Sequence, residues 1–310
     1  MNRPVVVGSA SRDLTTDDAR GWRLGGAAAY GALTLGRLGL QPRLLLGVDG
    51  PASRAAELDW LTAAGVDLEL VRLPEGPVFT NLETPAGRIQ RCETPGFRLA
   101  PDALPPDWSA SAAWMLVPVA DELDDSWAEV PPDRAFVALG WQGLLRTLGP
   151  GAIVARRPPR ASALTRRARL VGVSRADVEV TQADAGLLSC LRAPVTLAMT
   201  DGPNGGRVIA VRDHGHRTER RYEAITADRV ADPTGAGDAF LAGLVAGVLG
   251  HPLAGSGRRG SDVRLAAALG SLVVERPGLS GVPMIADVAE RLRRSLTRPS
   301  TSGDRAEAHD

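Results

Sequence analysis

Strand-like runs and helix-like segments alternate along the start of the chain, and this rhythm limits the fold more than any other feature. Val5–Gly8 is a β-branched run that ends in glycine, and Pro42–Val48 is a second apolar run. Gly26–Leu38 and Ala52–Ala64 have the apolar spacing of helices, and a glycine follows each. Strands that alternate with helices are typical of a parallel sheet with crossover helices. We therefore predict an α/β protein with three layers (αβα) around a mainly parallel central sheet.

The second half of the chain continues this pattern. Short apolar runs predict further strands at Trp114–Val119, Ala135–Leu139, Leu170–Val173 and Val195–Thr200. A hairpin is expected from Gly206–Arg212 and Arg217–Ala224, and helices are expected at Ala236–Leu249 and Val263–Glu275. The polar residues 299–310 are expected to form a disordered tail, which leaves 1–298 as a single domain.

Two segments interrupt the rhythm and predict a small β lid. Residues 13–25 are polar and too short for a crossover helix. Residues 77–98 alternate apolar and polar side chains on both sides of Pro85-Ala86-Gly87, which indicates a hairpin with one polar face. An antiparallel patch in an α/β chain often stands on the carboxyl edge of the sheet, where ligands bind. An exposed lid sheet also invites pairing between subunits, so a homodimer through the lid is expected.

Charge balance and residue usage exclude several functions. The chain has 36 Lys+Arg and 36 Asp+Glu residues, and every cation is an arginine because the sequence contains no lysine. Balanced charge argues against a nucleic-acid partner, and the missing lysine excludes a Schiff-base enzyme and a Walker A phosphate loop. Cys92 and Cys190 fit neither a disulfide framework nor a zinc ribbon. No signal peptide or membrane-length apolar run is recognisable, so we expect a cytoplasmic protein with no membrane partner.

The strongest chemical signal is the run ADPTGAGDAF at 231–240. The residues after Asp238 have the apolar spacing of a buried helix, so Thr234-Gly-Ala-Gly237 forms a small-residue turn at the helix N-terminus. Unpaired N–H groups and the helix dipole make such a terminus a binding site for an anion, with phosphate as the obvious candidate. Asp238 is either a capping carboxylate or a general base that takes a proton from an attacking hydroxyl.

This run resembles the carboxyl-terminal signature of the ribokinase-like (PfkB) family of carbohydrate and nucleoside kinases, and other segments follow in the family's order. Gly8-Ser-Ala-Ser-Arg-Asp13 is similar to the family's first-strand motif, and Gly25-Gly26 is similar to its amino-terminal signature. Thr200-Asp-Gly202-Pro-Asn-Gly205 is similar to its nucleotide-binding loop, and residues 77–98 fall where the family has its lid. The resemblance implies a ribokinase-like fold.

The resemblance also implies an ATP-dependent kinase that uses Mg²⁺ and phosphorylates a hydroxyl of a sugar, polyol or nucleoside. Asp238 would be the general base, and the amides of Gly235, Ala236 and Gly237 would form the anion hole for the γ-phosphoryl group. The adenine is expected between the 200–205 loop and the 263–275 helix. The implied substrate contacts are Asp13, Gly25 and Gly26, and the implied nucleotide contacts are Thr200, Gly202, Gly205, Thr234 and Ser271.

Departures from the family pattern concern the metal and the branch. Ala27 follows the paired glycines where many members have Asn or Lys, and an Asn common in the penultimate helix is replaced. Ser174-Arg-Ala-Asp177 stands in place of an Asn-x-x-Glu motif, which makes Asp177 the candidate metal-handling residue. With Gly25-Gly-Ala-Ala-Ala-Tyr30 and Trp141-Gln-Gly-Leu-Leu-Arg146, these features resemble the branch that contains myo-inositol kinases. Arg146 then either touches substrate or forms a surface ion pair.

Other features have ordinary structural interpretations. The G-x-G-x-x-G run at 255–260 follows a helix rather than a strand, so we interpret it as a linker. His214 and His216 lack a third ligand and are expected to be exposed, and the arginine-rich segment 156–169 is interpreted as solvated surface. The alternative to a kinase is a non-catalytic nucleotide- or sugar-binding relative, but the presence of both Asp13 and Asp238 favours the kinase.

Overall fold

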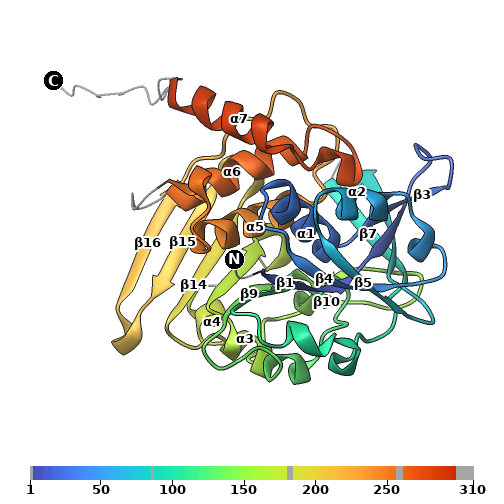
Figure 1. Cartoon of the computed structure of the whole chain (residues 1–310), viewed down its shortest axis with the longest axis horizontal. Helices are drawn as coiled ribbons and strands as arrows, with labels where there is room; N and C mark the ends of the chain where they lie inside the picture. Colours follow the sequence, from blue (N-terminus) through green and yellow to red (C-terminus); the bar gives the residue numbers. More distant parts are fainter. Residues whose placement is uncertain (1–2, 85–86, 180–183, 256–260, 298–310) are drawn as a thin grey trace.

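The computed structural model describes residues 3–84, 87–179, 184–255 and 261–297 (Figure 1). Its centre is a nine-stranded sheet in which all strands from β14 to β5 run parallel, whereas β15 and β16 are antiparallel at one edge. In sheet order these strands are β16 (Arg217–Tyr222), β15 (Gly206–Val211), β14 (Val195–Thr200), β13 (Leu170–Ser174), β9 (Phe136–Gly140), β8 (Ala113–Leu116), β1 (Val5–Ser9), β4 (Arg43–Val48) and β5 (Asp67–Arg72).

Helices cover both faces of this sheet, so the predicted three-layer fold is confirmed (Figure 1). Successive strand residues point to opposite faces, and each face has its own core. Val6 packs with helices of one face, and Val5 and Val7 pack with those of the other. The first face carries α1 (Ala27–Arg37), α2 (Glu57–Ala63), α5 (Ala236–Val248) and α6 (Ser261–Val273), with α7 (Ile285–Thr297) against α6; the second carries α3 (Ala163–Arg167) and α4 (Asp184–Leu188).

A separate five-stranded sheet contains the predicted hairpin. Its strands, in order, are β11 (Ala152–Ile153), β7 (Gly87–Thr94), β6 (Val78–Thr84), β2 (Ser11–Leu14) and β3 (Trp22–Gly25). Both lid segments therefore enter one sheet, because the 13–25 segment supplies β3 and part of β2. Strand β11 was not predicted, because its two residues carry no periodic signal. A further two-stranded ladder joins β10 (Arg146–Thr147) to β12 (Ala155–Arg156).

Some predicted boundaries were wrong. The helix expected over Ala52–Ala64 is divided, because a 3₁₀ turn at Ala52–Arg54 ends where Ala55 becomes extended (φ −70°, ψ 132°) and α2 begins at Glu57. Strand β5 was missed because this edge strand is nowhere fully buried and carries only a weak apolar pattern. The expected tail at 299–310 and residues 256–260 of the interpreted linker lie outside the described residues.

Three smaller expectations concern the cysteines, the histidines and the membrane. Cys92 and Cys190 are buried and form no disulfide, and His214 and His216 are exposed. Among the helices of the described ranges, none is long and apolar enough to cross a bilayer.

Candidate active site

The candidate site lies at the carboxyl edge of the parallel sheet. Asp13 follows β1, Asp177 follows β13, and Thr200 ends β14 beside Ser174 of β13. The N-terminus of α5 brings Asp238 to the same edge, because Asp13 and Asp177 both act electrostatically on its carboxylate. The fold therefore brings together residues that lie up to 225 positions apart, from Asp13 to Asp238.

The turn before α5 can only be built with glycine at position 235. Gly235 is the N-cap of this 13-residue helix and has a left-handed backbone (φ 84°). A Cβ there would fall 2.2 Å from Cε1 of Tyr30 in α1. Asp232 holds the turn from the other side, since its carboxylate accepts the N–H groups of Thr234 (2.9 Å) and Gly278 (3.1 Å).

The helix terminus is open toward an anion. No side chain caps α5, and a Cβ on Gly237 would meet nothing within 4 Å. Of the three amides predicted to form the anion hole, that of Ala236 donates to the carbonyl of Pro233, and this hydrogen bond is long at 3.4 Å. The first N–H groups of a helix have no intrahelical partner and lie at the positive end of its dipole. Phosphate would find both donors and space at this point.

Asp238 is held in a state suited to accepting a proton. Burial raises the pKa of its carboxyl to about 6, and the neighbouring charges of Asp177 and Asp13 raise it as well. Arg146 opposes them and lowers the pKa. A carboxylate with a pKa near 6 is ionised at neutral pH and is a stronger base than an ordinary aspartate.

Asp13 owes its position to the paired glycines. The hydroxyl of Ser11 donates to Oδ1 of Asp13 at 3.1 Å. A Cβ on Gly25 would fall 2.4 Å from Oδ2 of Asp13, and one on Gly26 (φ 101°) would fall 2.5 Å from the carbonyl oxygen of Ser9. Gly25 thus makes room for the carboxylate of Asp13, and Gly26 lets α1 begin directly against β1.

The inner face of the small sheet adds two residues that sequence reasoning missed. Asp13 lies opposite Phe79, and Asn81 lies opposite Gln90, whose amide donates to Oδ1 of Asn81 at 3.0 Å. Residues opposite one another, or two apart on a strand, share a face. Asp13, Asn81 and Gln90 therefore share a face with Phe79, which is 1% exposed and packs against the main body. The sequence signal that could have identified Asn81 and Gln90 is the polar face of the predicted hairpin.

Asp177 can assist a metal but cannot hold one alone. Its Oδ1 accepts from Nε2 of Gln142 (3.0 Å), and its Oδ2 accepts from the backbone N–H of Ser174 (3.1 Å). The described ranges hold no group of three or more His, Cys, Asp or Glu side chains that could bind a metal ion. Mg²⁺ commonly keeps several waters and binds through one or two carboxylates and substrate phosphates. The residues present fit that mode, and they do not form an all-protein cage.

The predicted nucleotide residues divide into two groups. Thr200, Gly202 and Gly205 lie in one strand-to-turn segment, where a Cβ on Gly202 (φ 52°) would meet nothing within 4 Å. Ser271 is different, because it is only 7% exposed and its hydroxyl donates to the carbonyl of Ala268 and accepts from Arg291. Its hydroxyl thus already has two partners inside the protein, and its contact with nucleotide stays a prediction.

Arg146 lies between the main body and the small sheet. It is the first residue of the short strand β10, which follows the 3₁₀ turn Gln142–Leu145. Its positive charge acts on both Asp238 and Cys92 of β7. Arg146 is therefore close enough to act electrostatically on both the N-terminus of α5 and the small sheet.

Comparison with known structures shows the class of fold. A nucleoside kinase from Methanocaldococcus jannaschii, described as an archaeal member of the ribokinase family, matches with a TM-score of 0.68 at 17% identity, over 95% of this chain and 99% of that one. A pyrophosphate-dependent kinase in the ribokinase family, complexed with a pyrophosphate analog and myo-inositol, gives 0.70 at 16% identity, over 93% and 99%. Arabidopsis thaliana ribokinase, complexed with ribose and ATP, gives 0.65 at 18% identity, over 94% and 99%. The chain therefore has the ribokinase-like fold, as predicted.

A comparison of sequences with known families agrees with the structural match. Residues 168–285 match the family described as pfkB family carbohydrate kinase, and no curated protein matches the chain significantly. This segment contains Asp177, the 200–205 loop and the N-terminus of α5. Residues 168–285 therefore resemble the pfkB family of carbohydrate kinases in sequence, and the whole chain has the ribokinase-like fold.

Proposed function

We propose that this enzyme transfers the γ-phosphoryl group of ATP to a hydroxyl of a small polyol, sugar or nucleoside, with Asp238 as the general base. The observation that carries the proposal is the open, uncapped N-terminus of α5 with Asp238 in its first turn. Phosphoryl transfer to an alcohol needs two parts: amides that bind the transferring anion, and a carboxylate that accepts the proton of the alcohol.

The remaining residues take roles that follow from their positions. Asp13 accepts hydrogen bonds from acceptor hydroxyls, and Asn81 and Gln90 supply further polar contacts from the same face of the small sheet. Arg146 keeps Asp238 ionised at neutral pH and faces the negative charge of the transferring group. The phosphates of the donor extend from the α5 terminus toward the Thr200–Gly205 loop. Asp177 would help to hold Mg²⁺, which would supply positive charge to those phosphates.

Myo-inositol is our leading acceptor within this class. The sequence features that resemble the inositol kinase branch meet at one place: Tyr30 packs on Gly235, Gln142 bonds Asp177, and Arg146 acts on Asp238. A ribokinase-family structure with bound myo-inositol has the same fold. Separate segments that converge on one site support a shared acceptor more strongly than any one of them does.

The test is ADP formation from ATP and Mg²⁺ with myo-inositol, ribose, fructose and common nucleosides. We expect turnover with at least one of these acceptors and loss of it in the Asp238→Asn protein. Pyrophosphate replaces ATP in a parallel series, because a similar structure belongs to a pyrophosphate-dependent kinase. Tight ATP binding without turnover on any acceptor would instead support the non-catalytic binding protein.

A further inference from the structure

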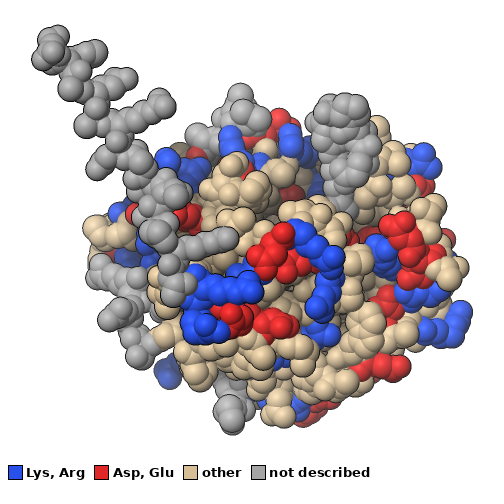
Figure 2. Space-filling view, turned by 90° about the horizontal axis from the view of Figure 1, so that it is seen from above, with Lys and Arg blue, Asp and Glu red and all other residues tan. Residues whose placement is uncertain are grey.

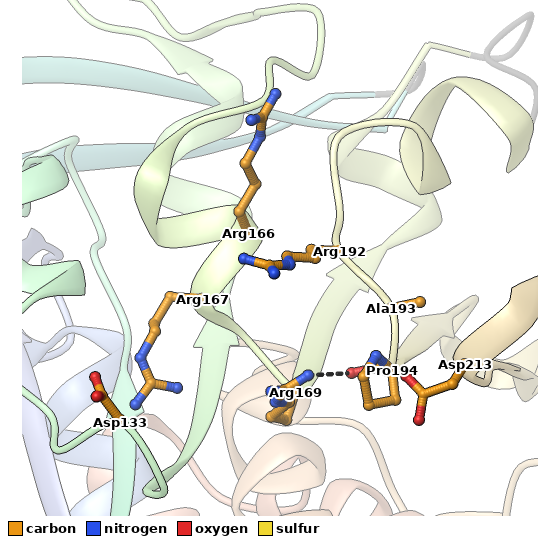
Figure 3. Close-up of a pocket in the computed structure, with 8 residues that line it drawn as sticks. All are labelled: Asp133, Arg166, Arg167, Arg169, Arg192, Ala193, Pro194 and Asp213. Atoms are coloured by element: carbon orange, nitrogen blue, oxygen red, sulfur yellow. Dashed lines mark hydrogen bonds between the residues drawn. The ribbon is translucent and has the colours of Figure 1, made fainter.

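A basic site lies at the edge of the sheet opposite the candidate active site. Arg166, Arg167, Arg169 and Arg192 line a hollow of about 400 Å³ together with Asp133 and Asp213 (Figure 3). We call it the arginine hollow. Arg169 directly precedes β13, and Arg192 lies just before β14. The arginine hollow therefore lies at the amino ends of parallel strands, whereas the candidate active site lies at their carboxyl ends.

The fold divides the arginine-rich segment that sequence analysis interpreted as solvated surface. Arg156 donates to the carbonyl of Ala176 and Arg157 to that of Leu144, so these two hold loops at the carboxyl edge. The arginines from 166 onward lie at the amino edge instead. Arg192, which is distant in sequence, joins them there.

The positive charge of the arginine hollow is not neutralised. Its four arginines and two aspartates leave an excess of two positive charges. None of the four arginines forms an ion pair with an acid in the described part of the chain. Elsewhere arginines sit beside acids, as in the ion pair of Arg207 with Asp184 at 2.6 Å, and Figure 2 shows basic and acidic side chains interspersed on the face seen there. Burial and the charge of Arg169 lower the pKa of Arg167, and the charge of Asp133 opposes them only in part.

Backbone carbonyls hold two of the guanidinium groups in place. Arg167 donates to the carbonyls of Pro132 (2.5 Å) and Ala135 (3.3 Å), and Arg169 donates to that of Pro194 (3.1 Å). These bonds orient the side chains without cancelling their charge. The side chains of Arg166 and Arg192 form no hydrogen bond with any described residue, so their guanidinium donors remain available.

We propose that the arginine hollow binds a small molecule that carries two or more phosphate groups. Guanidinium groups match phosphate oxygens bidentately, and two excess charges are balanced by a ligand with at least two phosphates. The volume is within the range of small-molecule sites. Asp133 and Asp213 lie on opposite sides of the arginines in Figure 3, which limits the length of the basic surface. A compact ligand fits this arrangement better than a nucleic-acid strand does.

The test is isothermal titration calorimetry with inorganic tripolyphosphate as the probe. It compares the wild-type protein with the Arg166→Gln/Arg192→Gln double variant, whose replaced side chains have no described partner. The matched control is Arg276→Gln/Arg293→Gln, which removes two exposed positive charges on the other face of the sheet. We expect the Kd of the hollow variant to rise at least tenfold and that of the control to change less than twofold. Any tripolyphosphate that binds at the candidate active site should contribute the same heat to the titrations of all three proteins.

Several results would overturn the proposal. Equal Kd values for the wild type and the hollow variant would do so, as would an equal loss in the control, which indicates general charge attraction. A 20-nucleotide single strand that binds the arginine hollow more tightly than tripolyphosphate would show a nucleic-acid surface instead. Should the double variant fail to fold, Arg192→Gln alone replaces it, with a Kd at least threefold higher as the expected result. Unchanged turnover of ATP in the hollow variant shows that the active site is intact.

Discussion

Asp238, the proposed general base, should lower the stability of the ligand-free protein at neutral pH. Its folded pKa of about 6 lies above the ordinary value of 3.8, so the protonated form is the one that the fold favours. The stability that this protonation provides is fully present below pH 3.8 and is lost as the pH rises through about 6. Above that pH the folded protein holds a carboxylate that burial, Asp13 and Asp177 all disfavour.

The Asp238→Asn substitution removes this cost. A pKa that folding raises by roughly two corresponds to a ceiling of about 3 kcal/mol, because each pH unit is equivalent to about 1.4 kcal/mol. Since the residue is partly exposed, solvent screening reduces the expected gain to about 1–2 kcal/mol at pH 8. At pH 4 the two proteins should be nearly equal in stability. Turnover should fall by about 10²–10⁴-fold, because the general base is lost.

Urea unfolding at pH 4, 6 and 8 measures the stability difference, and ADP formation measures turnover. Asp102→Asn is the control, since Asp102 is exposed and has no hydrogen bond or ion pair within the described residues. It should change neither quantity. Near-normal turnover in Asp238→Asn would remove this residue from the mechanism. A variant less stable than the wild type at pH 8 would refute the electrostatic argument.

Three further substitutions test neighbouring parts of the site, and a fourth tests the metal. Arg146→Gln should move the acidic limb of the kcat/KM profile above its expected position near pH 6, because Arg146 lowers the pKa of Asp238; an unmoved limb in a pH titration of activity would contradict this. Gly235→Ala should cost about 2 kcal/mol or more in urea unfolding, through its left-handed backbone and steric overlap. Gly237→Ala should leave stability within about 1 kcal/mol yet lower kcat/KM at least tenfold, since its methyl group occupies the anion space; normal kinetics would place the phosphate elsewhere. Asp177→Ala should raise the Mg²⁺ concentration for half-maximal activity, and an unchanged Mg²⁺ titration would exclude this role.

Sequence patterns predicted the central sheet well because its strands are buried on both faces. Such strands are continuous apolar runs, and β1 and β4 were predicted to within a residue or so at each end. Edge elements carried weaker signals: β5 is only partly buried, and β11 has two residues. Their formation depends on partners far along the chain, which local periodicity cannot report.

The candidate site shows the same division between local and distant information. The turn at Gly235 was predicted from its sequence, but the reason for that glycine is the ring of Tyr30, about two hundred residues earlier. Asn81 and Gln90 were missed because their importance depends on sharing a sheet face with Asp13. For Ser271, a motif position could not reveal that Arg291 contacts its hydroxyl.

A buried carboxylate connects these distant parts. Glu122 is 2% exposed, and burial raises its pKa, yet it accepts the backbone N–H groups of Ser9 (2.9 Å) and Ala120 (2.7 Å). It thereby fixes the end of β1, where the carbonyl of Ser9 leaves room only for glycine at the start of α1. Helix α1 then carries Tyr30 to Gly235 and so determines where α5 begins. The position of Asp238 thus depends on contacts that begin at the ends of β1 and β8, and the geometry of the candidate site is a property of the whole carboxyl edge rather than of the motif alone.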